Sequence, residues 1–155
     1  MFPVNDTTNT ETDTYSVISD NAQIYKTLNY DYVEMHTVLK NGDAELIDDY
    51  RSVRNWILKF LATPIDKYEI YEGTGFGTSL YKLKGYKSIS TLQYSQIVKE
   101  IKDGMLLNPN IRNVEDVRLW KEDKTTMLYI KVKLFDGYIL EEKTEVFEIN
   151  KSISQ

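Results

Sequence analysis

The chain has 155 residues, 41% of them hydrophobic and 28% charged, which is typical of one soluble globular domain with a single core. The formal net charge of −5 argues against a nucleic-acid-binding protein, because such proteins carry a basic face. The chain has no cysteine, which excludes disulfide bonds and thiolate chemistry. No apolar run approaches the roughly 18 residues that a membrane helix needs, and the start of the chain lacks the features of a signal peptide. We therefore expect neither nucleic acid nor a membrane as a partner.

Residues 1–28 are predicted to form an extended or disordered N-terminal arm. Positions 5–20 are rich in Thr, Asn and Asp and contain few apolar residues. Such a composition does not bury enough surface to repay the entropy lost on ordering. A few apolar residues would still let the arm lie along another surface: Val17, Ile18, Ile24 and Leu28.

Residues 29–150 are predicted to form one domain, followed by a C-terminal tail at 151–155. The domain opens with a strand over 32–40, because Val33, Met35, Thr37 and Leu39 alternate with other residues. Asn41–Gly42 predicts a turn. Asp43 is the expected N-cap of an amphipathic helix that ends at Thr63–Pro64. The apolar stripe of this helix has helical spacing: Leu46, Tyr50, Val53, Ile57 and Phe60.

A short strand at 68–71 and a glycine-rich turn at 73–77 are expected next. Ser90 and Gln93 then form a capping box, which predicts the start of a second helix. Gly104 weakens the last turn of this helix, and Asn108–Pro109 ends it. The buried stripe is expected to be Tyr94, Ile97, Val98, Ile101 and Met105.

The last part of the domain predicts an antiparallel meander of three strands. Its middle strand alternates strictly over 127–134, with an apolar face and a mixed, solvent-facing one. The first strand loses this period near Asn113, which indicates a bulge or bend. Asp136–Gly137 is typical of a type I′ hairpin turn. The fold class is therefore predicted to be α+β, an antiparallel sheet with a C-terminal three-stranded meander, packed against two amphipathic helices and preceded by a flexible arm.

The third strand, over 138–149, is apolar at both ends and polar on both faces at 141–145. A strand of this kind does not suit the centre of a sheet. Charges of this kind protect a free sheet edge against aggregation. We therefore expect this strand to form an edge.

The sequence contains no strong motif for a catalytic or metal site. The turn at 73–77 matches neither a P-loop nor a dinucleotide fingerprint, so a strained turn is the better interpretation. His36 is the only His or Cys, which argues against a zinc site and a catalytic triad, and we expect it on the surface. Among 24 acidic residues some carboxylate pair always exists, and Asp48–Asp49 and Glu141–Glu142 are most simply solvated charges. We expect no cofactor, no metal and no enzymatic activity.

Arg112 is the last residue of the corner at 106–112, where the second helix meets the sheet. It is either an ordinary surface arginine or an anchor whose planar guanidinium binds carbonyl groups or a carboxylate at an interface. The residues alone leave both interpretations open.

From about residue 41 to residue 147 the chain resembles the sheath initiator, or baseplate wedge subunit, of contractile phage tails and phage-tail-like bacteriocins. The similar segments are, in order, 41–44, 68–77, 83–85, 106–114 and the final meander with Gly137. The corner departs from the family pattern, because Asn108 replaces a glutamate and Asn110 is inserted after Pro109.

The resemblance implies a structural protein present in six copies around the tail tube. Its expected partners are the tail sheath protein, baseplate wedge proteins and tube or hub proteins. Its expected location is the baseplate of a virion or a phage-tail-like particle, assembled in the bacterial cytoplasm. Such a subunit would link the wedge to the first sheath ring and template sheath polymerisation by β-strand augmentation.

Two sets of site residues follow from this resemblance. The corner expected to bind the wedge comprises Asn108, Pro109, Ile111 and Arg112. The edge expected to pair with a sheath strand comprises Tyr138, Leu140, Thr144, Val146 and Phe147. The alternative function, kept open by a phage origin, is a small glycan hydrolase that uses paired carboxylates.

Overall fold

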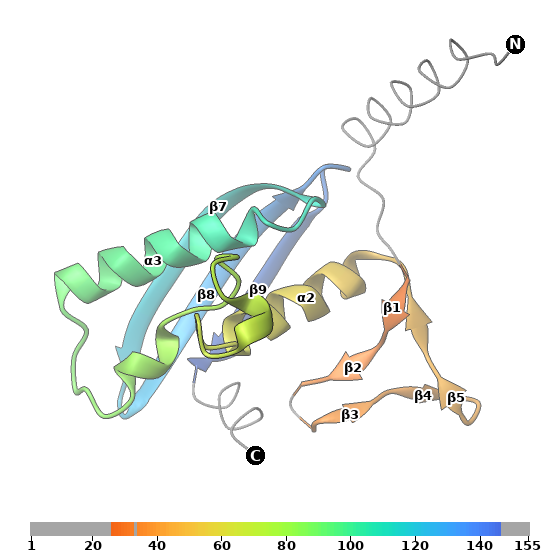
Figure 1. The fold of residues 1–155 in the computed structure, drawn as a ribbon, viewed down its shortest axis with the longest axis horizontal. Helices are drawn as coiled ribbons and strands as arrows, with labels where there is room; N and C mark the ends of the chain where they lie inside the picture. Colours follow the sequence, from red (N-terminus) through yellow and green to blue (C-terminus); the bar gives the residue numbers. More distant parts are fainter. Residues whose placement is uncertain (1–25, 33, 147–155) are drawn as a thin grey trace, which may run out of the picture.

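The computed structural model describes residues 26–32 and 34–146 (Figure 1). None of the helices in these ranges is long and apolar enough to cross a membrane. The helices and strands are β1 (Thr27–Leu28), β2 (Tyr30–Asp31), β3 (His36–Thr37), β4 (Leu39–Lys40), β5 (Asp43–Ala44), β6 (Leu46–Ile47), α2 (Tyr50–Ala62), the 3₁₀ helices η1 (Glu69–Tyr71) and η2 (Leu80–Leu83), α3 (Thr91–Met105), β7 (Ile111–Glu122), β8 (Thr125–Leu134) and β9 (Ile139–Glu145).

The meander is confirmed, with strand order β7-β8-β9 and antiparallel pairing throughout. Strand β8 shows the predicted alternation, because every second side chain from Thr126 to Leu134 is buried and those between are half-exposed. The irregularity near Asn113 is also confirmed: the register of β7 against β8 shifts between Ile111 and Asn113 and again between Val114 and Asp116. Arg112 and Glu115 are therefore the extra residues of two bulges.

Both helices lie against the same face of this sheet (Figure 1), which confirms the predicted α+β fold. Helix α3 begins with the predicted capping box, in which Ser90 and Gln93 each accept a backbone hydrogen bond from the other residue. The two helices and the sheet enclose one core. The largest fully buried side chains of the described residues are Phe60, Ile47, Ile57, Leu61, Leu80, Leu83, Ile101, Met105, Leu128, Ile130, Leu134 and Val53, and all of them except Ile47 belong to this core.

Gly104 has a packing role where α3 approaches α2. A Cβ atom at this position would lie 2.5 Å from Cε2 of Phe60 and closer still to its Cζ. Phe60 is fully buried and belongs to an aromatic cluster, stacked on Trp56 with ring centroids 5.5 Å apart and edge-on to Phe76 at 5.5 Å. Glycine therefore lets the helices come close together.

Residues 27–47 depart from the prediction of one long strand over 32–40. They form three short segments, 27–31, 36–40 and 43–47, and each segment pairs with one of the others over its first half and with the remaining one over its second half. We call these three segments together the β-junction. At its centre Asn29 N–H donates to Glu45, Val38 N–H donates to Asn29, and Glu45 N–H donates to Val38, at 2.8 to 2.9 Å. This cyclic set of backbone bonds depends on contacts distant in sequence, which a local alternation does not reveal.

The predicted N-cap Asp43 is wrong, because Asp43 lies in β5 and α2 begins seven residues later, at Tyr50. Asp49 is the N-cap, and its carboxylate accepts from the backbone N–H of Arg51 at 2.9 Å. The same carboxylate pairs with the Arg51 side chain at 3.0 Å, and that hydrogen bond is the main reason why the pKa of Asp49 is lowered. The sequence offers more than one aspartate as a cap before the apolar stripe. Asp43 is not available as the cap because it is paired in β5 of the β-junction, and Asp49 takes that role.

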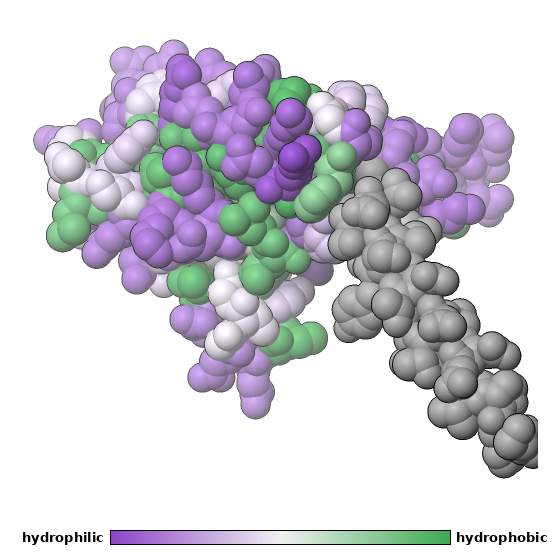
Figure 2. All heavy atoms as spheres, turned by 90° about the horizontal axis from the view of Figure 1, so that it is seen from above, coloured by the Kyte–Doolittle hydropathy of each residue, from purple (hydrophilic) through white to green (hydrophobic). Residues whose placement is uncertain are grey.

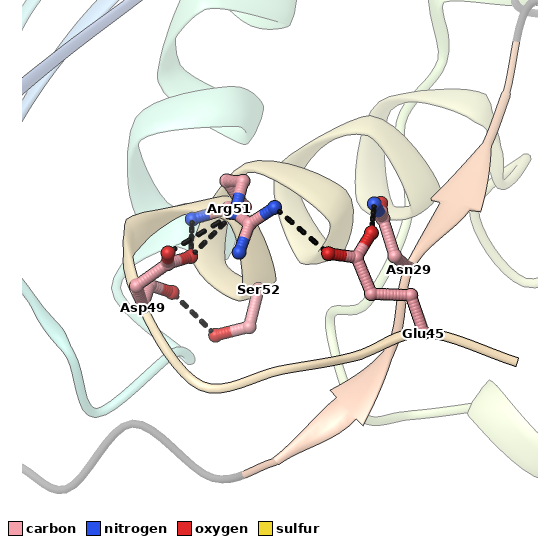
Figure 3. A network of polar contacts seen from close by, with 5 residues as sticks. All are labelled: Asn29, Glu45, Asp49, Arg51 and Ser52. Carbon is pink, nitrogen blue, oxygen red and sulfur yellow. Dashed lines mark hydrogen bonds and ion pairs between the residues drawn. The ribbon is translucent and has the colours of Figure 1, made fainter. Parts of the chain in front are cut away.

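A polar network ties the β-junction to the start of α2 (Figure 3). The Asn29 amide donates to Glu45 Oε2 at 2.7 Å, and Arg51 reaches Glu45 Oε1 at 3.4 Å. The hydrogen bond from Asn29 is the main cause of a lowered pKa of Glu45. Arg51 thus holds one carboxylate from the β-junction and one from the cap of its own helix.

Two further local predictions are wrong. Residues Glu69–Tyr71 form a 3₁₀ helix and not a strand. The turn before β9 is not of type I′, because only Gly137 has a positive φ, at 88°, and Asp136 does not. Gly137 N–H and the Tyr138 carbonyl both bond Leu134, which is the pattern of a three-residue loop with a glycine bulge. Asp136 instead accepts from Tyr138 N–H, at 2.9 Å.

Candidate docking surfaces

Strand β9 is an edge of the meander, as predicted, and its register shows which backbone groups face outward. Leu134 N–H donates to the Tyr138 carbonyl at 2.9 Å, and the pairing of β8 with β9 then runs without a shift. Opposed residues of an antiparallel pair alternate between exchanging both hydrogen bonds and exchanging none. Counting from Tyr138, the residues bonded to β8 are Leu140, Glu142 and Thr144. Those directing N–H and C=O away from β8 are Ile139, Glu141, Lys143 and Glu145.

These four outward residues are open for pairing. Within the described ranges no hydrogen bond reaches their backbone groups. The edge of β9 is also regular over its full length, because its register against β8 has no shift. An incoming strand would therefore find an uninterrupted ladder.

The residues predicted for the edge site do not all point to an incoming strand. Leu140 and Val146 are only 4% and 1% exposed, and they lie in the core. Thr144 is half-buried, on the side of the sheet that the helices cover. Tyr138 is 43% exposed and stacks on Tyr50 of α2, with ring centroids 4.8 Å apart. Phe147 lies outside the described residues.

Charged side chains lie on both faces of the sheet along the β9 edge. On the helix side, Glu142 accepts two hydrogen bonds from Arg54 of α2, at 2.8 and 3.0 Å. On the other face, Lys131 of β8 lies 3.9 Å from Glu141. Inward-pointing charges and charged rims discourage unspecific edge-to-edge pairing. Sequence reasoning found these charges but did not identify Arg54 as the partner of Glu142.

The opposite edge of the sheet, along β7, is less regular. Its two bulges place Arg112 and Glu115 out of register with β8. Bulges terminate pairing and twist a strand away from new partners. Of the two edges, β9 thus offers the better template. In the face shown in Figure 2, hydrophobic residues lie in small patches between hydrophilic ones, a surface unlike a large apolar interface.

The corner between α3 and β7 brings together two buried and two exposed residues of the predicted site. Asn108 is 6% exposed, and its side chain accepts from Asn110 N–H at 2.9 Å, so it stabilises the turn. Ile111 is 3% exposed and belongs to the core. Pro109 and Arg112 are exposed. Arg112 forms no hydrogen bond or ion pair in the part of the chain that the structure describes, so its guanidinium is available.

The features considered for catalysis have structural roles. Gly73, Gly75 and Gly77 all have positive φ values, and a Cβ at Gly77 would lie 2.8 Å from the Thr63 carbonyl. The glycine-rich segment is thus the strained turn that the sequence favoured. His36 is exposed and pairs with Glu34 at 3.1 Å. No group of three potential metal ligands occurs among the described residues.

The paired carboxylates do not face a common site. Asp49 caps α2, while the neighbouring Asp48 is exposed. Glu141 and Glu142 are successive residues of a strand, so their side chains point to opposite faces of the sheet. The Glu141–Glu142 pair therefore does not place two carboxylates on one side of the sheet, as glycoside hydrolysis would require of it.

A groove that sequence reasoning missed lies between α2 and the corner. It consists of two adjoining hollows of about 380 Å³ each, which share Trp56 and Lys59 of α2. We call it the α2–corner groove. Its lining residues are Thr27, Leu28, Tyr32, Ser52, Val53, Asn55, Trp56, Lys59, Tyr71, Thr74, Phe76, Leu107, Asn108, Pro109 and Asn110. These residues come from four separate segments, so no local sequence pattern identifies the groove.

The family model described as contractile injection system sheath initiator matches residues 26–138. The match covers the β-junction, both helices, β7 and β8, and it ends just before β9. No curated protein matches the sequence. The family match covers most of the chain and confirms the resemblance seen in its motifs. The chain belongs to the contractile injection system sheath initiator family.

Proposed function

We propose that this protein links the baseplate wedge to the first sheath ring of a contractile tail and templates sheath polymerisation through the free edge of β9. Family membership supports a structural role in the sheath-associated part of a contractile injection system. The observation that carries the finer proposal is the row of outward backbone groups on Ile139, Glu141, Lys143 and Glu145. A sheath-derived strand would pair with this row by β-augmentation.

The energy available from the edge explains why assembly would need more than one subunit. Two groups on each of four residues allow up to roughly eight hydrogen bonds, each worth about 0.5–1.5 kcal/mol net. The total of about 4–12 kcal/mol is comparable with the roughly 4–15 kcal/mol that association costs. Backbone pairing at one edge is therefore marginal. We propose six copies around the tube, because a ring of linked edges binds by avidity.

The second part of the proposal concerns the corner. Arg112 and Pro109 are exposed beside two buried residues, Asn108 and Ile111, that hold the turn rigid. A rigid support reduces the entropy lost when a partner binds. We propose that Arg112 contacts carbonyl or carboxylate groups of a wedge protein. Such a particle would be a virion tail or a phage-tail-like bacteriocin, assembled in the bacterial cytoplasm.

Proline substitution at Lys143 tests the template. Proline has no N–H to donate, and it is tolerated at an edge where that N–H faces outward. The Lys143→Pro subunit should fold and enter baseplates, and tubes should form on them without an ordered first sheath ring. Sheath of normal length on these baseplates, seen by electron microscopy, would contradict the proposal.

Two control variants separate the possible causes. Lys143→Ala keeps the backbone N–H but removes the contact between Lys143 and the ring of Trp120, 5.5 Å away, and it should support normal sheath. Thr144→Pro acts on the other side of the strand, because the N–H of Thr144 is directed to β8. This variant should lower the thermal stability of the subunit, whereas Lys143→Pro should change it little.

A further inference from the structure

The α2–corner groove has the properties of a site for an extended peptide. Its wall contains the exposed face of an aromatic cluster, in which Trp56 packs edge-on to Phe76 with ring centroids 5.6 Å apart. Lys59 is the only charged residue among the described residues that line it. Asn55 is 7% exposed, and its Nδ2 has no hydrogen-bond partner among the described residues. An apolar surface, a single cation and an unused amide donor together suit a segment with apolar side chains, a carboxylate and free carbonyl groups.

The chain itself supplies such a segment. Residues 1–25 precede β1, and Thr27 and Leu28 of β1 line one end of the groove. These 25 residues contain four carboxylates and no Lys or Arg, which complements the lone Lys59. Ile24 and Tyr25 are the apolar residues nearest to β1 in sequence, and Asp20 is the nearest carboxylate in sequence.

Length also agrees. Six extended residues span about 20 Å, whereas α2 from Ser52 to Lys59 rises about 10 Å. A segment that enters beside Thr27 is therefore long enough to pass Asn55 and Trp56 and to reach Lys59. The family match begins at residue 26, directly after this segment.

We propose that residues 20–25 dock in the α2–corner groove, with Ile24 and Tyr25 against Trp56 and the Asp20 carboxylate near Lys59. A backbone carbonyl of this segment accepts from the Asn55 amide. The groove shares Asn108 and Pro109 with the corner but does not include Arg112, so this contact is separate from the contact proposed for the Arg112 guanidinium.

Tryptophan fluorescence tests the proposal in the full chain. The sequence has two tryptophans, and Trp120→Phe leaves Trp56 as the only one. In this background Ile24→Ser/Tyr25→Ser should raise the acrylamide quenching constant of Trp56 about two-fold, as expected when one face of a half-buried indole is uncovered. The matched control Phe2→Ser/Val4→Ser removes apolar groups from the same segment, far from β1, and should leave quenching unchanged. Circular dichroism of both variants should match the parent.

Three results would overturn the proposal. The first is equal quenching in the parent and in Ile24→Ser/Tyr25→Ser. The second is an equal rise of the quenching constant in the Phe2→Ser/Val4→Ser control, which would show that residues 24 and 25 make no specific contact with Trp56. The third is protection of Trp56 that grows with protein concentration, which would identify a second copy as the occupant.

Discussion

Arg112 is the residue at which we propose that an effect on assembly can be separated from an effect on folding. It is the extra residue of a β7 bulge, it is exposed, and it forms no hydrogen bond or ion pair within residues 26–32 and 34–146. Arg112→Ala should therefore change the free energy of unfolding by no more than about 0.5 kcal/mol. Incorporation into baseplates should fall, because the proposed wedge contact is lost.

The control for Arg112 is Arg118→Ala in the same strand. Arg118 is exposed and pairs with Asp116 at 2.7 Å, a surface ion pair worth about 0–1 kcal/mol. We expect this variant to enter baseplates normally. If Arg112→Ala unfolds the subunit, or if both variants assemble equally well, Arg112 is not a wedge anchor.

Gly104 illustrates a residue whose role is visible only in three dimensions. The sequence presents it as a weak point of α3, but the structure shows that a Cβ there would collide with the buried ring of Phe60. Overpacking costs about 1–3 kcal/mol, while alanine gains about 1 kcal/mol of helix propensity. We expect Gly104→Ala to destabilise the protein by up to about 2 kcal/mol in denaturant titration.

Ser95→Ala is the matched change for Gly104→Ala, because Ser95 is on the exposed face of the same helix. It should alter stability by less than about 0.5 kcal/mol. A stabilising effect of Gly104→Ala would show that the helices separate without cost, and that close packing is not the reason for the glycine.

At the scale of elements, the start of α2 is the clearest test of local structure. Asp49 caps the helix through Arg51 N–H, whereas Asp43 lies in β5 and is exposed. Asp49→Ala should lower the free energy of unfolding by about 0.5–2 kcal/mol. Asp43→Ala should have a much smaller effect. The opposite order in thermal or chemical denaturation would restore Asp43 as the cap.

Elements with a strong internal period were predictable from the sequence. The alternation of β8, the capping box at Ser90 and the slip near Asn113 are local signals, and each is confirmed. The β-junction was not predictable, since its three segments hold each other through Asn29, Val38 and Glu45, which are distant in sequence. Backbone groups there are satisfied by non-local partners that no pattern of single residues encodes.

The candidate sites were predictable to different degrees. Polar residues on both faces of 141–145 indicated an edge strand, and the order β7-β8-β9 confirms that position. The direction of each backbone N–H and C=O group could be assigned only from the register of β8 against β9. This register directs the N–H of Lys143 outward and that of Thr144 to β8, so proline tests the edge at Lys143 and not at Thr144. The α2–corner groove required packing of four segments and left no trace in the sequence.

At the scale of the whole molecule, the two proposed partner contacts lie on different strands of one three-stranded sheet. The wedge corner follows α3, and the template edge lies on β9, the far strand of the same sheet (Figure 1). The central strand β8 and the shared core connect them. We propose that such a subunit holds a sheet edge at a fixed position relative to the baseplate, as a template for the first sheath ring requires.

Hydrogen–deuterium exchange on assembled baseplates, with and without sheath, tests the template edge most directly. A peptide that covers β9 reports on the amides of Ile139, Glu141, Lys143 and Glu145, which are unbonded in the free edge. We predict that these four amides exchange quickly before sheath is added and become protected once the first ring forms, while β8 stays protected throughout. Unchanged exchange in β9 on fully sheathed particles, or new protection confined to β7, would contradict the account.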